Sequence, residues 1–257
     1  MKIMAFDVGG TAIKFGLVDE NFNVLFSEEF PTNTYKDTDN MVLRAMEAKL
    51  KEYEGQYDAV GISTAGQVNV NTGVIHDGVG NIPNYNYSDL CGTFEPQFNV
   101  PVAVDNDVNC AAIGEAHFGA AKGESDFLCL TYGTGVGGAI FINGDVYRGS
   151  KFAGGEFGHM ATHKDGRPCT CGRIGCYEAY AACRVFTTSV SERMGKPMNG
   201  REIFMEENLK NNKFNFETLK TAKKRIEILP TTETTVLKQQ SKEIEPMERR
   251  KIKNRRK

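Results

Sequence analysis

Long hydrophobic segments are absent from this sequence. No stretch reaches the run of about 18 apolar residues that a membrane-spanning helix needs. The first residues, MKIMAFDVGG, enter a strand-like pattern without the apolar core of a signal peptide. We therefore expect a cytoplasmic protein without a membrane partner. With 257 residues, 40% hydrophobic content and a net charge of −2, the chain is long enough for one large domain or two medium ones.

An even set of cysteines is also missing, because the chain has seven. Three of them, Cys169, Cys171 and Cys176, form the pattern C-T-C-x4-C, which is too tight for a convincing disulfide framework. A metal site is the better interpretation of this trio. The other four are expected to be ordinary core or near-surface residues: Cys91, Cys110, Cys129 and Cys183.

Glycine is absent from residues 201–257, although the whole chain contains 27 glycines. This segment holds 16 basic and 9 acidic residues, a net charge of +7, whereas residues 1–200 hold 15 and 24, a net charge of −9. From about Leu209 onward the sequence buries too little apolar surface to offset the entropy of ordering it, so we expect a solvated or disordered tail. A basic nucleic-acid-binding arm is the alternative, but interleaved aromatic residues and a partner motif are missing, and no nucleic-acid partner is expected.

The first 200 residues read as an α/β protein. Three short apolar segments in a row indicate strands of a meander, over residues 2–9, 12–19 and 22–30. Apolar residues at helical spacing predict a helix within residues 39–53. The same reading predicts a buried strand at 57–64, a strand at 101–107, a helix at 108–119, and a strand, glycine turn and hairpin over 126–149.

The order of strand, glycine turn and returning strand occurs twice, at residues 2–19 and 126–142. Glycine lets backbone N–H groups approach phosphate oxygens closely, and the hydroxyls of Thr11 and Thr134 can add donors. Neither turn is a Walker phosphate loop, which ends in Gly-Lys-Ser/Thr before a helix. One such turn alone usually just closes a hairpin. Two at corresponding points, the first preceded by Asp7 as a candidate Mg²⁺ ligand, predict a phosphate clamp between two similar lobes.

Five segments resemble, in this order, the ROK family (repressor, open reading frame, kinase) of the actin-like ATPase superfamily: DVGGT, VDNDVNCAA, LTYGTGVGG, GGEFGH and CTCGRIGCYEAY. The resemblance extends from the N-terminus to about residue 204. It implies a two-lobed actin-like ATPase (ribonuclease H-like) α/β fold with a small zinc-stabilised loop. It also implies a kinase that transfers the γ-phosphoryl group of ATP to a hexose hydroxyl, usually at carbon 6.

Asp107 in VDNDVN matches the catalytic aspartate of the family. A carboxylate where a strand ends and a helix starts can accept the proton of a sugar hydroxyl that attacks phosphorus. On the residues alone, a helix N-cap is the commoner role for such an aspartate. The resemblance places Asn81 and Asn106 on sugar hydroxyls, although Asn81 also reads as a turn asparagine. It places ATP, with Mg²⁺, on both glycine turns through Asp7, Gly9, Gly10, Thr11, Lys14, Gly133, Thr134 and Gly135.

The pattern H-x9-C-x-C-x4-C comprises His159, Cys169, Cys171 and Cys176, four ligands that suit structural Zn²⁺ in a closed tetrahedral site. If one imidazole nitrogen of His159 binds zinc, the other can hydrogen-bond a sugar hydroxyl. The resemblance places the carboxylates of Glu156 and Glu178 on neighbouring sugar hydroxyls, although isolated glutamates are more often solvated. Dimers are common in the family, so a homodimer is one assembly that the resemblance implies.

Three parts are predicted: an N-terminal lobe over residues 1–115, an incomplete C-terminal lobe over 116–207 and an atypical basic tail over 208–257. ROK kinases continue with a region containing another glycine pair that completes the ATP-binding lobe, and nothing after Gly200 can supply it. We therefore expect a truncated or frame-shifted product, with a catalytically impaired sugar- or zinc-binding remnant as the alternative to an active kinase. A sugar-responsive regulator is less expected, because only six residues precede Asp7 and leave no room for a helix-turn-helix domain.

Overall fold

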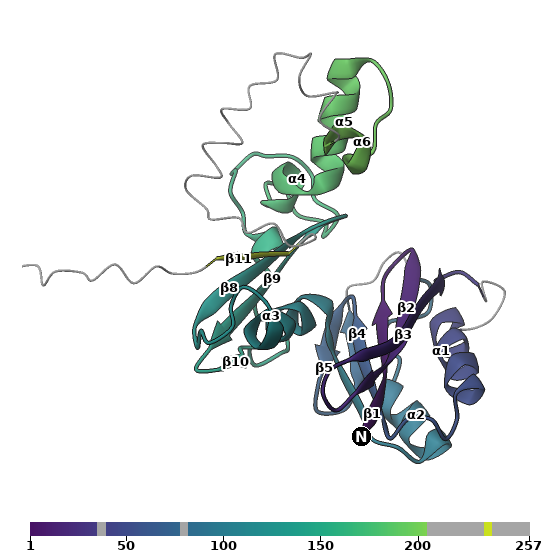
Figure 1. Cartoon of the computed structure of the whole chain (residues 1–257). Coiled ribbons are helices and arrows are strands. Elements are labelled where there is room, and N and C mark those ends of the chain that lie inside the picture. Colours follow the sequence, from purple (N-terminus) through teal and green to yellow (C-terminus); the bar gives the residue numbers. More distant parts are fainter. Residues whose placement is uncertain (35–39, 78–81, 205–233, 238–257) are drawn as a thin grey trace, which may run out of the picture.

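The computed structural model of the chain describes residues 1–34, 40–77, 82–204 and 234–237. Two sheets with their helices form two lobes, and a group of short helices follows the second sheet (Figure 1). The first sheet has the order β3-β2-β1-β4-β7 and the second has the order β10-β9-β8-β11. This arrangement confirms the mixed α/β class predicted from the sequence.

The first sheet contains the predicted meander. Its strands are β1 (Lys2–Val8), β2 (Ala12–Asp19), β3 (Val24–Pro31), β4 (Ala59–Thr64) and β7 (Val102–Asn106). Strands β1, β2 and β3 pair antiparallel in chain order, whereas β4 pairs parallel with β1, and β7 pairs parallel with β4. Because parallel strands run in one direction, β1, β4 and β7 bring their carboxyl ends to the same edge of the sheet.

The core of the first lobe lies between this sheet and two helices. Alternate residues of β1, namely Met4, Phe6 and Val8, point into it and are buried. Helix α1 (Met41–Glu52) adds Val42 and Leu50, and α2 (Leu90–Phe98) covers the same lobe. A small hairpin, β5 (Gln67–Asn69) and β6 (Val74–Asp77), completes it.

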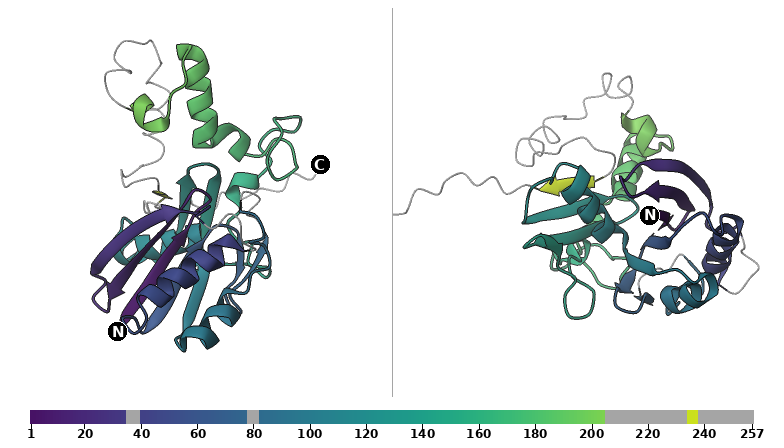
Figure 2. Two further views of the ribbon diagram at one scale, coloured as in Figure 1. Left: turned by 90° about the vertical axis from the view of Figure 1, so that its right-hand side faces the viewer. Right: turned by 60° about the horizontal axis from the view of Figure 1, so that its bottom comes forward.

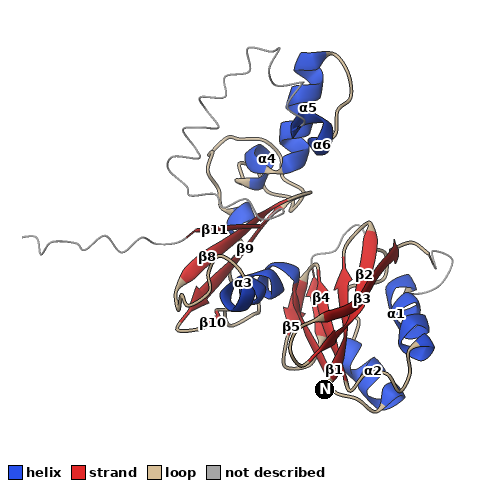
Figure 3. Ribbon diagram, viewed as in Figure 1, coloured by secondary structure: helices blue, strands red, loops and turns tan. Residues whose placement is uncertain are grey.

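The second lobe begins earlier than the predicted boundary at residue 115. It contains α3 (Asp107–Phe118), β8 (Phe127–Tyr132), β9 (Val136–Ile142) and β10 (Asp145–Val146). Helix α3 lies beside β8 and β9 (Figure 3). Val108 and Ala112 of α3 belong to one apolar core with Phe127 and Ala139 of the sheet. The first core ends at Val104, so the two cores divide between residues 104 and 108.

One strand lies within the predicted tail. Strand β11 (Thr234–Leu237) pairs antiparallel with β8 and extends the second sheet by one strand. The expectation of a tail without regular structure is therefore wrong at these four residues, because the open edge of β8 offers backbone donors and acceptors to an added strand. The remaining part of the tail lies outside the described residues.

Short helices follow the second sheet. They are the 3-10 helix η1 (Phe157–His159) and the α-helices α4 (Glu178–Ala181), α5 (Cys183–Met194) and α6 (Gly200–Phe204). Helices α5 and α6 lie side by side (Figure 2). Val190 and Ile203, one from each helix, share a small apolar core with Met198 of the connecting loop. Within the described residues, none of the helices has the length and apolar character needed to cross a bilayer.

Candidate active site

The first glycine turn (residues 9–11) joins β1 to β2 and is held by Thr32, the residue after β3. The Thr32 backbone N–H donates to the Thr11 carbonyl at 3.0 Å, and its hydroxyl donates to the Gly9 carbonyl at 2.7 Å. Thr32 is only 1% exposed. Inside the turn, the Gly9 N–H donates to the Ala12 carbonyl at 3.1 Å. The turn is therefore fixed by contacts within its own lobe.

Asp7 and Lys14 lie opposite each other in the register of β1 and β2. Asp7 also pairs in register with Ser63 of β4, whose hydroxyl donates to Asp7 Oδ1 at 3.1 Å. Ser63 in turn lies beside Asp105 of β7. Residues in one such row project from the same face of a sheet, so this polar row crosses the face opposite the buried apolar residues.

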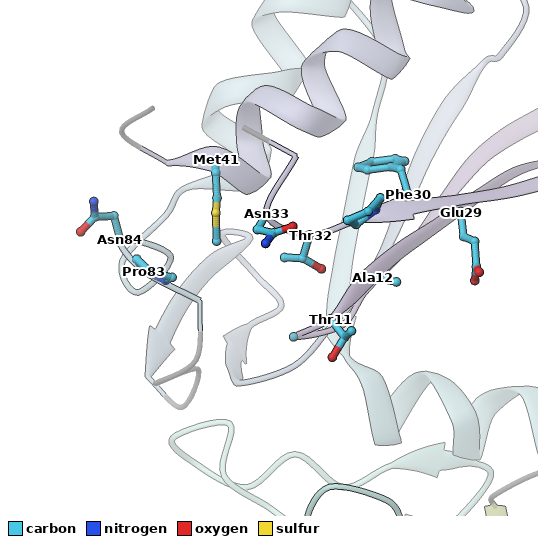
Figure 4. A pocket seen from close by; sticks show the side chains of 11 residues that line it. Thr11, Ala12, Glu29, Phe30, Thr32, Asn33, Met41, Pro83 and Asn84 are labelled. Carbon is cyan, nitrogen blue, oxygen red and sulfur yellow. The ribbon is translucent and has the colours of Figure 1, made fainter. Parts of the chain in front are cut away.

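A cavity of about 710 Å³ lies beside the first glycine turn (Figure 4). Both apolar side chains, such as Phe30, Met41 and Pro83, and polar ones, such as Thr32, line it. Of the predicted site residues, Gly10 and Thr11 belong to its lining. The full described lining is Gly10, Thr11, Ala12, Glu29, Phe30, Pro31, Thr32, Asn33, Met41, Pro83 and Asn84.

Asn106 and Asp107 lie where the two cores meet, at the end of β7 and the start of α3. Asn106 is the N-cap of α3, because its side-chain oxygen accepts from the backbone N–H groups of Val108 (2.9 Å) and Asn109 (3.3 Å). The N-cap interpretation of Asp107 is therefore wrong. Asn106 Nδ2 also donates to the Gly66 carbonyl at 3.0 Å, so the side chain predicted to bind sugar has structural partners on both sides.

Asp107 is the first residue of α3, and its carboxyl has an altered pKa. Burial raises this pKa to about 6, repulsion from Asp7 adds to the increase, and a hydrogen bond from the Val108 N–H opposes it. Asp107 still has an exposed surface. The raised pKa therefore results from the protein atoms packed around the carboxyl and not from complete exclusion of solvent. The first lobe thus acts directly on the ionisation of the first residue of α3.

An ion pair joins the two lobes next to Asp107. Arg148, just after β10, donates from Nε and Nη2 to Asp105 Oδ2 at 2.9 and 2.7 Å. The other oxygen of Asp105 accepts from the Asn106 N–H at 2.8 Å and from Asn109 Nδ2 at 2.9 Å. These side chains are largely buried, at 22% exposure for Arg148 and 12% for Asp105. Four donors therefore fix the carboxylate two residues before Asp107.

The second glycine turn (residues 133–135) joins β8 to β9 and is held by residues 178–184. The Cys183 backbone N–H donates to the Gly133 carbonyl at 3.0 Å, and Arg184 Nε donates to the Thr134 carbonyl at 3.0 Å. The carboxylate of Glu178 contacts the other side of the turn. A Cβ added at Gly135 would lie 2.4 Å from Glu178 Oε2, so this glycine is required by the close approach of a carboxylate.

Glu178 is 7% exposed, and both of its carboxylate oxygens have protein partners. Oε2 accepts from the Val136 N–H at 3.0 Å. Oε1 accepts from the Thr170 hydroxyl at 3.0 Å and lies 3.5 Å from Arg184 Nη2. The sequence offers no signal for the contact with Val136, which is 42 residues away in the chain, whereas Arg184 is only six residues from Glu178. The predicted sugar contact of Glu178 stays a prediction.

The four predicted metal ligands, His159, Cys169, Cys171 and Cys176, converge, and we call them the Cys/His cluster. One ligand atom from each lies within 4.8 Å of the others. Cys169 Sγ is 3.6 Å from His159 Nδ1, and Cys171 Sγ is 3.7 Å from Cys176 Sγ. Both distances match the edges of a tetrahedron around Zn²⁺, which are about 3.8 Å for 2.3 Å bonds to sulfur. Two of the six edges therefore have the length that a tetrahedral zinc ion needs, and the other four are no longer than 4.8 Å.

The thiols of the cluster are free rather than oxidised, since the sulfur atoms are much farther apart than the roughly 2.05 Å of a disulfide. The backbone N–H of Arg173 is the main cause that lowers the pKa of Cys171. A lowered pKa favours the thiolate, which is the form that binds metal. Burial instead raises the pKa of Cys176 to about 11, so of these two thiols only Cys171 favours the thiolate.

Glu156 and His159 lie at the two ends of η1, which packs on β9. Close backbone contact fixes this segment, because a Cβ at Gly155 would lie 2.4 Å from the Gly138 carbonyl oxygen, and Gly155 has a φ of +85°. The Glu156 side chain is exposed and makes no cap hydrogen bond. Asn81, the remaining predicted sugar ligand, lies outside the described residues.

Comparison with known proteins gives a consistent result. The ROK family profile matches residues 3–240, so the expectation that the resemblance ends near residue 204 is wrong. The chain is 37% identical over 209 residues to a beta-glucoside kinase of Listeria monocytogenes, covering 79% of this chain and 68% of that one. It is 34% identical over 203 residues to a glucokinase of Streptomyces coelicolor, covering 77% and 62%.

A solved structure of a ROK family glucokinase from Streptomyces griseus, in complex with glucose and AMPPNP, is also similar. It has a TM-score of 0.65 and 35% sequence identity, and the similarity covers 76% of this chain and 62% of that one. The chain thus spans between 62% and 68% of the length of the two curated relatives. The profile match covers most of the sequence and includes both glycine turns, Asp107 and the Cys/His cluster. This chain belongs to the ROK family.

Proposed function

We propose that this chain is an ATP-dependent hexose kinase with Asp107 as the general base. The observation that carries the proposal is the position of Asp107 at the junction of the two lobes, each of which has a glycine turn. Asn106, and not Asp107, is the N-cap of α3. The relatives support the same reaction class, since their names describe a beta-glucoside kinase and a glucokinase. The related structure that contains glucose and AMPPNP supports a sugar and a nucleotide as the two ligands.

In this reaction a hexose hydroxyl, usually that on carbon 6 in the family, gives its proton to the Asp107 carboxylate as its oxygen attacks the γ-phosphorus of ATP. The bond between the γ-phosphorus and the bridging oxygen breaks, and ADP leaves with the electron pair. Because its pKa is raised to about 6, Asp107 is still ionised at neutral pH but is a stronger base than an ordinary aspartate. Such a base contributes roughly 10²- to 10⁴-fold to the rate.

The two glycine turns would supply backbone N–H donors to the phosphates of ATP, with the hydroxyls of Thr11 and Thr134 beside them. Asp7 would hold Mg²⁺ or its waters, since carboxylates and water are the ligands that Mg²⁺ prefers. Lys14, opposite Asp7 in the register, would add a positive charge near the phosphates. The chain's own contribution is therefore to align the phosphates with Asp107 and to offset their charge.

The Cys/His cluster would hold one structural Zn²⁺. Four protein ligands close the coordination sphere, so such an ion orders the loop and leaves the phosphoryl group to other residues. Because His159 directs Nδ1 towards Cys169, its Nε2 would be the atom that hydrogen-bonds a sugar hydroxyl. Glu156, at the other end of η1, would accept from a neighbouring hydroxyl. Metal analysis of the purified chain is expected to find about one zinc ion per molecule, and a fully active protein without zinc would contradict this role.

A coupled assay for ADP release tests the kinase proposal. The purified chain is incubated with ATP, Mg²⁺ and a panel of hexoses that includes glucose, mannose, fructose and N-acetylated hexosamines. We expect ADP release that depends on at least one sugar. Sugar binding without ADP release would overturn the proposal and favour a non-catalytic sugar-binding protein. A cytoplasmic location and a homodimer stay predictions.

A further inference from the structure

Residues 178–184 contact both the second glycine turn and the Cys/His cluster. On the side of the turn, Glu178 accepts from the Val136 N–H, Cys183 donates to Gly133 and Arg184 donates to Thr134, each at 3.0 Å. Three hydrogen bonds from one short segment therefore hold a turn of only a few residues. The shape of this turn depends on where residues 178–184 lie.

On the side of the cluster, the same segment continues directly from a ligand. Glu178 is two residues after Cys176, and the Ala179 N–H donates to the Cys176 carbonyl at 3.1 Å. Glu178 Oε1 accepts from the hydroxyl of Thr170, which lies between the ligands Cys169 and Cys171. Glu178 thus contacts the loop that carries two ligands through one oxygen and the glycine turn through the other.

Arg184 completes this connection. Its Nη2 lies 3.5 Å from Glu178 Oε1, while its Nε holds the Thr134 carbonyl. The guanidinium therefore contacts the carboxylate and the turn at the same time, which a single-point ammonium cannot reproduce. Gly135 leaves no room between the turn and Glu178, so a shift of the carboxylate would be transmitted to the turn.

We propose that Glu178 and Arg184 are positioning residues that couple the Cys/His cluster to nucleotide binding at the second glycine turn. Metal binding at the cluster would raise the affinity of the second turn for the nucleotide phosphates. Nucleotide binding would raise the affinity of the cluster for metal by the same factor, because such coupling is reciprocal. The proposal rests on the proposed function in taking the second turn as a phosphate site. It adds that the cluster acts on the nucleotide side of the reaction as well as on the sugar.

The first test compares Arg184→Met with Arg44→Met, in which the same change is made on an exposed arginine of α1. Calorimetric titrations of the zinc-loaded full chain measure the affinity for MgADP and, separately, for glucose. Loss of the Arg184 contacts is expected to weaken MgADP binding roughly 3- to 10-fold. The loss of glucose affinity should be smaller than the loss of MgADP affinity, and Arg44→Met should change neither affinity. Arg184→Lys keeps a cation near Glu178 but loses the Nε donor, so it should weaken MgADP binding less.

The second test measures MgADP affinity before and after zinc is removed with a chelator that is then separated from the protein. We expect the wild-type chain to lose MgADP affinity on stripping, and Arg184→Met to lose less because its coupling is already broken. Equal MgADP affinity in loaded and stripped wild-type protein, or an equal loss of glucose and MgADP affinity in Arg184→Met, would overturn this inference alone. Failure of the wild-type chain to bind MgADP at all would overturn the proposed function as well.

Discussion

The two glycine turns occupy corresponding places in the two lobes but depend on different parts of the chain. The first is held by Thr32, which follows the next strand of the same sheet. The second is held by residues 178–184, which follow the Cys/His cluster in sequence. The first turn can therefore form with its own sheet, whereas the second requires a distant segment to be in place.

The two turns have similar local sequences, but only the first is held entirely by residues of its own sheet and the residue that follows it. In both hairpins glycine permits a tight connection between antiparallel strands. In the first hairpin Gly16 makes room for β3 of the same sheet, since an added Cβ would lie 2.4 Å from the Phe26 carbonyl oxygen. In the second, Gly137 and Gly138 make room for other elements, since an added Cβ would lie 2.4 Å from the Val108 side chain and from the Gly155 carbonyl oxygen, respectively. The second hairpin is thus built into its surroundings, and its phosphate-binding role can be altered from outside.

Arg148→Met should have the largest effect on stability, because it cuts the ion pair that joins the lobes. Asp105 would be left with a largely buried, uncompensated carboxylate. We expect a loss of about 2 to 3 kcal/mol in the free energy of unfolding, measured with urea. Arg44→Met removes an arginine that is 62% exposed, and its partner Glu47 keeps the ion pair with Lys51, so this change should cost no more than about 0.5 kcal/mol. Equal losses in the free energy of unfolding would show that the ion pair between the lobes stabilises the fold no more than the pair in α1 does.

The pH dependence of kcat/KM tests the influence of the first lobe on Asp107. The carboxyl must be ionised to accept a proton, and its pKa is raised to about 6, so activity should fall as the pH decreases through 6. At pH 5 roughly one-tenth of the neutral value should remain, equivalent to about 1.4 kcal/mol. In Asp7→Asn, loss of repulsion should move the inflection to lower pH. A profile that is flat down to pH 5 would exclude this role for the Asp107 carboxyl.

Thr32→Val tests whether the first turn is independent of the cluster. The change keeps the shape of a buried side chain but removes the hydroxyl that donates to the Gly9 carbonyl. It should cost about 1 kcal/mol of stability and weaken MgADP binding. The loss of MgADP affinity should be the same in zinc-loaded and zinc-stripped protein. A zinc-dependent effect of Thr32→Val would remove the contrast between the two turns.

The smallest effect is expected for Gly133→Ala, because an added Cβ there meets no atom within 4 Å. Its free energy of unfolding should change by less than about 0.5 kcal/mol. Gly135→Ala is the matched variant, since its methyl group would displace Glu178 from the Val136 N–H and cost about 1 kcal/mol. Thermal unfolding of both variants makes the comparison. A more damaging change at Gly133 than at Gly135 would contradict the contact with Glu178.

Features with a local cause could be predicted from the sequence. A short apolar segment predicts β2 at residues 12–19, the bounds that the structure shows, and helical spacing within 39–53 predicts α1. The Cys/His cluster was predictable because three of its ligands lie within eight residues. In each case the residues that decide the outcome are close together in the chain.

Features that depend on long-range contacts could not be predicted in this way. The pattern in 101–119 predicts a strand and a helix but does not show that α3 packs on the second sheet. Similarly, the sequence marks Asp107 as the candidate cap, and the hydrogen bonds of the folded chain are needed to identify Asn106 in its place. The contact of Glu178 with Val136 depends on a fold that brings together two residues 42 positions apart in the chain.

The central claim, that Asp107 takes the proton in phosphoryl transfer, is tested most directly by comparing kcat for the wild-type chain and Asp107→Asn with ATP, Mg²⁺ and the preferred hexose. The account predicts that kcat falls by roughly 10²- to 10⁴-fold. MgADP and hexose affinities should be retained, and thermal unfolding should not shift to lower temperature, because the variant removes a charge whose raised pKa shows that the fold disfavours it. An Asp107→Asn protein that binds both ligands and turns over at the wild-type rate would contradict the account.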